Sequence, residues 1–146
     1  MSKTATFNFD AVDYEVACET PFEFELKHPE TGEGLGVFLS VVGTESATFK
    51  NYVRSEGDKA RRRNLERELK NEKPDILPMK EEEEMTAAAL AACVVSWRTG
   101  DEPVIVWGDR RLECNHANAT EWLGRFAFAR SQVNAEATKI ANFTAS

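Results

Sequence analysis

The amino-acid sequence predicts an α+β fold, in which an N-terminal β-hairpin or small antiparallel sheet precedes a predominantly helical part with a buried central helix. Three observations predict this class. Apolar and charged residues alternate near residue 22, the apolar spacing becomes helical from residue 46, and a long alanine-rich apolar segment begins at residue 85. A chain of 146 residues is long enough for one complete domain and too short for two ordinary ones, so we expect a single domain over residues 1–146.

The β-rich part covers residues 1–43. Phe22, Phe24 and Leu26 alternate with charged residues, and a turn with proline and glycine separates them from an apolar run at residues 36–42. This pattern predicts a β-hairpin, and it favours a hairpin turn over a phosphate-binding loop for the Gly-x-Gly-x-Gly sequence within it, because no helix follows. Phe7 alternates with its neighbours too, so a third strand or an ordered arm is expected upstream.

Residues 44–73 predict a charged helix. Phe49, Tyr52 and Val53 have the i, i+3, i+4 spacing of one helical face, and Leu65 and Leu69 repeat that spacing. Apart from these leucines, nearly all residues from 58 to 73 are charged, which is typical of a solvated helix that projects from the body of a protein. Residues 74–80 contain two prolines, which cannot continue a helix, and are expected to form a linker.

The central helix is predicted within residues 81–146, the helical part with a short hairpin. Four successive glutamates at residues 81–84 favour a helix N-terminus, because carboxylates interact well with the positive end of the helix dipole. Residues 85–97 are apolar on nearly every side, so they are expected to form a buried helix that ends at Gly100.

A second hairpin is predicted at residues 104–113, followed by two helices. Asn115 has the side chain of a helix N-cap. The apolar stripe of the first helix comprises Ala119, Trp122, Leu123 and Phe126. The stripe of the last helix comprises Val133, Ala137, Ile140 and Ala141.

Charge and hydropathy exclude several classes of partner. Asp and Glu number 25 against 18 Lys and Arg, which gives a net charge of −7, so nucleic-acid binding is not expected. The longest apolar stretch, residues 85–95, is about half of the ~20 residues that cross a bilayer, so no membrane association is expected. Three cysteines, an odd number at wide spacing, and the lack of a secretory signal predict a protein of a reducing cytoplasm.

The pattern of reactive residues does not predict an enzyme. His28 and His116 lack the sequence context of a known nucleophile. Cys114 and His116 could donate zinc ligands together with Cys93 and His28, but structural zinc sites usually draw on close pairs such as C-x₂-C. We therefore expect neither a catalytic site nor a metal or other cofactor.

Exposed aromatic and aliphatic side chains are the candidate partner-binding residues, because aromatic residues dominate interface energetics. Trp97 and Trp122 lie among apolar residues and are assigned to the core, whereas Trp107 stands beside a hairpin turn. The candidate partner-binding residues are Trp107, Phe49, Tyr52, Leu65 and Leu69.

The order of features in residues 82–143 resembles that of the tail assembly chaperones of long-tailed, siphovirus-type bacteriophages. The features that carry the resemblance are an alanine-rich helix reaching Trp97, a turn at Gly100, a short strand pair ending at Leu112, then Asn118, Trp122-Leu123 and a closing helix to Phe143. Members of the family commonly have a polar residue and a proline before the second of these helices, where this chain has Cys114-Asn115-His116.

The resemblance implies a non-enzymatic protein of the infected bacterium's cytoplasm. Such a protein binds the tape-measure protein, keeps it soluble and extended, helps tail-tube subunits polymerise around it, and is absent from the mature virion. Self-association is expected, because many modestly bound copies cover a long chain best. Two alternatives stay open, a tail-completion or head–tail connector protein retained in the virion, and a small metal-dependent enzyme.

Overall fold

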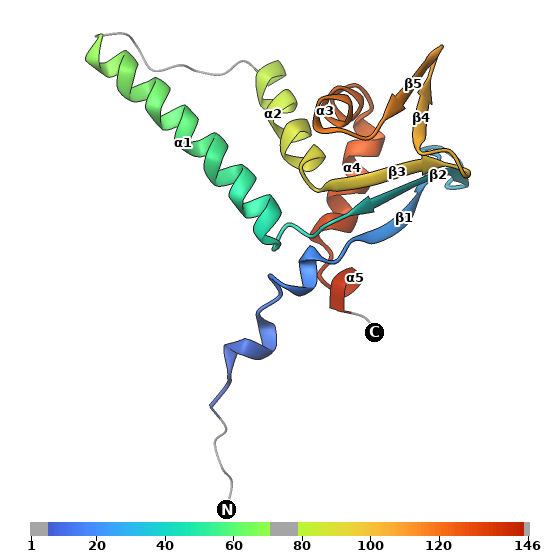
Figure 1. Cartoon of the computed structure of the whole chain (residues 1–146), viewed down its shortest axis with the longest axis horizontal. Coiled ribbons are helices and arrows are strands. Elements are labelled where there is room, and N and C mark those ends of the chain that lie inside the picture. The colour runs from blue at the N-terminus through green and yellow to red at the C-terminus, as the bar shows by residue number, and fades with distance from the viewer. Residues whose placement is uncertain (1–5, 71–78, 145–146) are drawn as a thin grey trace, which may run out of the picture.

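The computed structural model describes residues 6–70 and 79–144 and has the α+β architecture that the sequence predicts (Figure 1). An antiparallel sheet has the order β1-β2-β3, formed by β1 (Phe22–Lys27), β2 (Gly34–Val41) and β3 (Val94–Thr99). The predicted hairpin is confirmed as β1 and β2, in which Phe24 pairs with Leu39. Leu39 pairs in turn with Trp97 of β3, so these three side chains line one face of the sheet and contribute to the core.

The outer edge of β1 is closed at one end by a side chain. The amide of Gln132, from α4 (Ala127–Thr138), accepts a hydrogen bond from the Lys27 N–H at 2.8 Å and donates one to the Lys27 carbonyl at 2.9 Å. The same residue therefore satisfies the donor and the acceptor that a further strand would use.

The central helix is shorter than predicted. α2 (Met79–Ala91) ends before Cys93, and the segment from Val94 to Trp97 forms β3 instead of the last helical turn. An unbroken apolar run suits a buried strand as well as a buried helix, and the β-branched pair at Val94 and Val95 favours the strand. The Val42 N–H donates to the Cys93 carbonyl at 2.9 Å, which fixes the start of this third strand beside β2.

The upstream segment is not the third strand. It contains short 3₁₀ turns at Phe9–Val12 and Ala17–Glu19, and the side chain of Asn8 caps the first by accepting from the Asp10 N–H at 3.0 Å. The local hydrogen bond competes with extended structure, which explains why the alternation of Phe7 and Phe9 misleads.

The charged helix is confirmed as α1 (Ala47–Leu69), which continues through Gly57 without a break. Its N-cap is Ser46, whose hydroxyl oxygen accepts from the Phe49 N–H at 3.2 Å. Residues 71–73 of the predicted helix and residues 74–78 of the predicted linker lie outside the described residues, and the linker's last two residues belong to α2.

The C-terminal elements follow the prediction closely. β4 (Val104–Trp107) and β5 (Arg110–Glu113) form the second hairpin, and Asn115 caps α3 (His116–Arg125) by accepting from the Asn118 N–H at 2.8 Å. The last helix is divided: α4 ends at Thr138, and α5 (Ala141–Thr144) follows an extended Lys139. Ile140, predicted on the buried stripe, lies in this break and is partly exposed.

The core forms where the sheet meets α2, α3 and α4. Trp97 and Trp122 are both buried as predicted, with ring centroids 5.6 Å apart, and the Trp97 indole N–H donates to the Leu112 carbonyl at 2.9 Å. α1 stands outside this core and extends away from it (Figure 1). The candidate site lies between α1 and α2.

Candidate functional site: the groove between α1 and α2

The base of α1 is held firmly against the body of the protein. Ser46 is fully buried, and the Glu19 carboxylate accepts hydrogen bonds from the N–H and the hydroxyl of Thr48, at 2.7 and 2.8 Å. Phe49 packs against the core one turn later. Beyond this anchored first turn α1 makes few contacts with the described residues, and it diverges from α2 (Figure 1).

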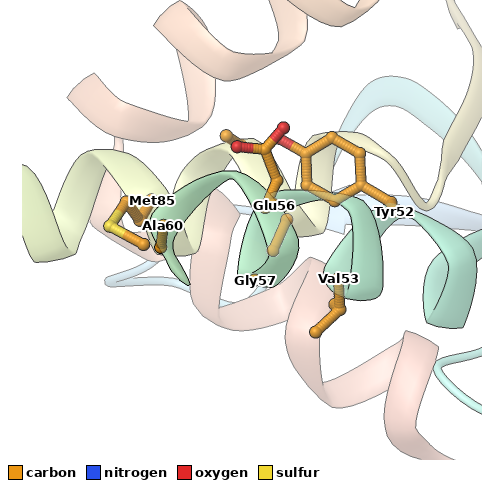
Figure 2. A pocket seen from close by; sticks show the side chains of 8 residues that line it. Tyr52, Val53, Glu56, Gly57, Ala60 and Met85 are labelled. Atoms are coloured by element: carbon orange, nitrogen blue, oxygen red, sulfur yellow. The ribbon is translucent and has the colours of Figure 1, made fainter. Parts of the chain in front are cut away.

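An apolar groove of about 270 Å³ lies between the two helices (Figure 2). Its lining comprises Tyr52, Val53, Glu56, Gly57 and Ala60 of α1, and Met85, Ala88 and Ala89 of α2. Val53 and Met85 leave 45% and 48% of their surface exposed, although both are large apolar residues. The groove is therefore an apolar surface that the described part of this chain leaves open to solvent.

Tyr52 lines the groove and also contacts α3. Its ring contacts that of His116 with centroids 5.2 Å apart, and His116 Nε2 lies 2.9 Å from the Ala88 carbonyl oxygen, within hydrogen-bond distance. Partial burial raises the pKa of the Tyr52 phenol above its ordinary value, and the nearby Glu56 carboxylate raises it further. The phenol is thus neutral at physiological pH, and α1, α2 and α3 meet at this point.

Small residues keep the groove open. Gly57 lies in the middle of α1, where glycine costs roughly 1 kcal/mol relative to alanine. Its backbone is helical, and a Cβ added there would meet only the guanidinium end of Arg61, at 3.8 Å. Neither backbone conformation nor crowding within this structure therefore requires glycine, and what its lack of a side chain provides is room in the groove.

The five residues singled out from the sequence do not form one site. Tyr52 lines the groove, whereas Phe49 is half-buried against the core. Leu65 and Leu69 are 57% and 79% exposed on the distal half of α1. Leu65 follows Val53 by twelve residues, a rotation of about 120° beyond whole turns, so the two leucines face away from the groove.

Trp107 lies apart from the groove, beside the second hairpin. Its ring packs edge-on against Phe126 at 5.1 Å between centroids, and the Arg110 guanidinium lies over it at 5.2 Å. Arg110 also pairs with Glu121 at 2.7 Å, and this hydrogen bond lowers the pKa of the Glu121 carboxyl. Trp107 faces a second hollow of about 550 Å³, which the acidic side chains of Glu83 and Glu84 also line.

The histidines and cysteines are engaged in local structure. His28 lies in the β1–β2 turn, where Nδ1 accepts from the Glu30 N–H at 3.1 Å. Burial raises the pKa of the Cys93 thiol to about 12 and also raises that of Cys114, so both thiols stay protonated at neutral pH. Among residues 6–70 and 79–144, no three His, Cys, Asp or Glu side chains are grouped to hold a metal ion.

Sequence reasoning missed the α2 wall of the groove. The sequence predicts a buried helix for the segment that contains Met85, Ala88 and Ala89, but these three residues line the groove, and the opposite face of α2, with Ala87 and Leu90, is the face buried in the core. One signal was available on α1, because Val53, Gly57 and Ala60 share the i, i+4, i+7 spacing of a single helical face.

Comparisons with models of protein families, with curated proteins and with solved structures find no match to this chain. Within the part of the chain that the structure describes, every helix is too short or too polar to span a bilayer.

Proposed function

We propose that this protein is a phage tail assembly chaperone, which binds the tape-measure protein, keeps it soluble and promotes polymerisation of the tail tube around it. The single observation that carries the proposal from the structure is the open apolar groove between α1 and α2. In this proposal the protein works without catalysis in the cytoplasm of the infected bacterium, interacts with tail-tube subunits as they assemble, and is absent from the mature virion.

The shape of the groove suits a helical partner. Two diverging helices with small residues between them present an apolar groove, and an amphipathic helix can lay its apolar face into such a surface. A tape-measure protein, being long and helical, exposes apolar stripes until the tube encloses it, and these stripes drive aggregation. Covering one stripe per bound copy would keep that chain in solution.

The chemistry around the groove supports reversible binding. Apart from Glu56, the lining is apolar or aromatic, so affinity would come from burying a few side chains. Each contact is then modest, and arriving tube subunits can displace the chaperone. The net charge of −7 would keep the loaded complex soluble.

Co-expression with the tape-measure protein tests the proposal. The wild-type chain is expected to move the tape-measure protein from the pellet to the soluble fraction and to co-purify with it in several copies. Gly57→Leu fills the groove while improving the helix propensity of α1, so it should abolish this effect without unfolding the protein. Gly57→Ala is the matched control, because it adds only a methyl group at the same position.

Analysis of purified virions separates the proposal from its alternative. A tail-completion or head–tail connector protein would be present at a fixed copy number, whereas a chaperone would be missing. An insoluble tape-measure protein in the presence of the wild-type chain, together with this chain in the virion, would refute the chaperone function.

A further inference from the structure

We propose that the outer edge of β1 binds an extended segment of a partner protein, which adds to the sheet as a further strand antiparallel to β1. The segment lies in a cleft of about 470 Å³, the β1–α4 cleft, which is lined by residues of β1 on one side and by Gln132 and Ala135 of α4 on the other. This cleft shares no lining residue with the α1–α2 groove, so strand addition here is independent of the proposed function.

The backbone N–H and C=O groups of Glu23 and Glu25 point away from β2, toward the open side of the sheet. In an antiparallel pair, successive residues of a strand direct these groups alternately toward the partner strand and away from it. The N–H and C=O of Lys27 bond to Gln132, on the side away from β2, so those of Glu25 and Glu23 point to the same side. Among the residues that the structure describes, no group bonds to these four backbone groups.

The pairing on the other side of β2 leads to the same result. The Gly36 carbonyl accepts a hydrogen bond from the Gly100 N–H, next to β3, so the alternate residues Leu39 and Val41 bond to β1. They are opposite Phe24 and Phe22, which leaves the two glutamates between and after these phenylalanines unpaired. An extended peptide is complementary to such an edge, because its own donors and acceptors repeat at the same spacing.

The floor of the β1–α4 cleft is apolar and suits small side chains. Phe22 and Phe24 are half-buried there, and Ala135 is exposed on the facing side of α4. A side chain of the added strand that points to the floor would contact Phe24 and Ala135, whereas its neighbours would lie beside Glu23 on the solvent-facing side. The expected ligand is therefore a short segment in which polar residues alternate with small or β-branched apolar residues.

The charges at the cleft favour one end of this segment. Each carboxylate at the cleft has a partner within the chain: Glu23 with Arg98, Glu25 with Lys27, and Glu136 with the Asn142 amide. The Lys139 amine also lines the cleft, and it forms no ion pair with any residue in the described ranges. Gln132 lies beside Lys27 and Phe143 contacts Phe22, so Lys139 lies toward the Phe22 end of β1. An antiparallel segment leaves the cleft at that end, where a carboxylate near its C-terminus would meet Lys139.

Titration of a synthetic peptide into the isotope-labelled full chain tests strand addition by nuclear magnetic resonance. The probe is the hexapeptide Thr-Val-Thr-Val-Thr-Asp with both ends blocked, and a dissociation constant of about 1 mM or lower is expected. At about nine-tenths saturation, hydrogen exchange of the Glu23 and Glu25 N–H groups should slow by about tenfold, because only the free fraction exchanges. Unchanged exchange of both amides at about 5 mM peptide would overturn the proposal.

Replacement of Glu23 tests the backbone hydrogen bonds. Glu23→Pro removes an N–H that faces the cleft and no hydrogen bond within the sheet, so an edge strand should tolerate it. Glu23→Ala is the matched control, because it loses the same carboxylate but keeps the N–H. The proline variant should bind the peptide about tenfold more weakly than the alanine variant, since a peptide carbonyl is left unpaired. Equal affinities of two folded variants would refute pairing at this edge.

Filling the cleft from the side of α4 provides a test that leaves β1 unchanged. Ala135→Leu places a larger side chain in the cleft and should weaken peptide binding by about tenfold or more. Asn134→Leu adds the same side chain to the neighbouring exposed position, outside the cleft lining, and should bind as the wild type does. Wild-type affinity of Ala135→Leu would contradict occupancy of the cleft.

A second peptide of identical composition tests the orientation of the segment. Asp-Thr-Val-Thr-Val-Thr, also blocked, carries its carboxylate at the other end and should bind about two- to fivefold more weakly than the first peptide. Lys139→Gln should remove this difference, because it removes the charge that distinguishes the two ends. Equal binding of the two peptides to the wild type, or a difference that persists in Lys139→Gln, would show the antiparallel placement to be wrong.

Discussion

Replacing Ser46 with alanine should loosen the wall of the groove that α1 provides. Ser46 is fully buried, and its hydroxyl oxygen accepts from the Phe49 N–H at 3.2 Å. Losing a serine N-cap costs typically about 1 kcal/mol and up to about 2 kcal/mol. Because Ser46 is buried, water cannot readily replace the lost acceptor at the first turn of α1, and the cost of the substitution should lie near the upper end of this range.

The expected destabilisation of Ser46→Ala is therefore about 1.5–2 kcal/mol. For a chain of this length that corresponds to a fall in Tm of roughly 3–8 °C, measured by differential scanning calorimetry and checked by urea denaturation. Ser55→Ala is the matched control, since Ser55 is an exposed serine within the same helix and its replacement should change stability by no more than about 0.5 kcal/mol. Equal Tm values for the two variants would refute the capping role and with it the account of how α1 is positioned.

Three further changes test the core and one surface ion pair. Leu90→Asp places an unpaired carboxylate in the buried face of α2 and should cost several kcal/mol, so a soluble variant with unchanged Tm would contradict that burial. Trp97→Phe removes the indole donor to the Leu112 carbonyl and should lower the free energy of unfolding by about 1–3 kcal/mol in urea titrations; no change would argue against a structural role for this hydrogen bond. The pKa of Glu121 is lowered by Arg110, so its contribution to stability is present above the unfolded pKa and is lost as the pH falls through the lowered folded pKa. Glu121→Gln should flatten the acid side of the stability–pH profile, and an identical profile would refute the pairing in solution.

Local chemistry explains the elements that could be predicted from sequence. The first hairpin follows from alternation at Phe22 and Phe24 and a turn rich in glycine, and α1 and α3 start at residues with capping side chains, Ser46 and Asn115. These signals act within a few residues of the chain, so no knowledge of distant partners is needed to interpret them.

The missed features depend on distant partners. Whether Val94 and Val95 extend a helix or form a strand is decided by the free edge of β2, which lies more than fifty residues away in sequence. The groove depends on the angle at which α1 leaves the body relative to α2, and no local pattern encodes that angle. The orientation of Leu65 relative to Val53 could have been worked out, because it requires only helical geometry.

Gln132 also affects what happens when many copies of this chain are crowded together. At an exposed edge strand, identical molecules can add further strands and form fibrils, and β1 is such an edge strand. A strand arriving from another molecule would have to break the two hydrogen bonds between Gln132 and Lys27 before it could pair along the whole edge. It would also meet the charges of Glu23 and Glu25. Gln132 therefore protects this end of the β1 edge from the addition of a strand from another molecule.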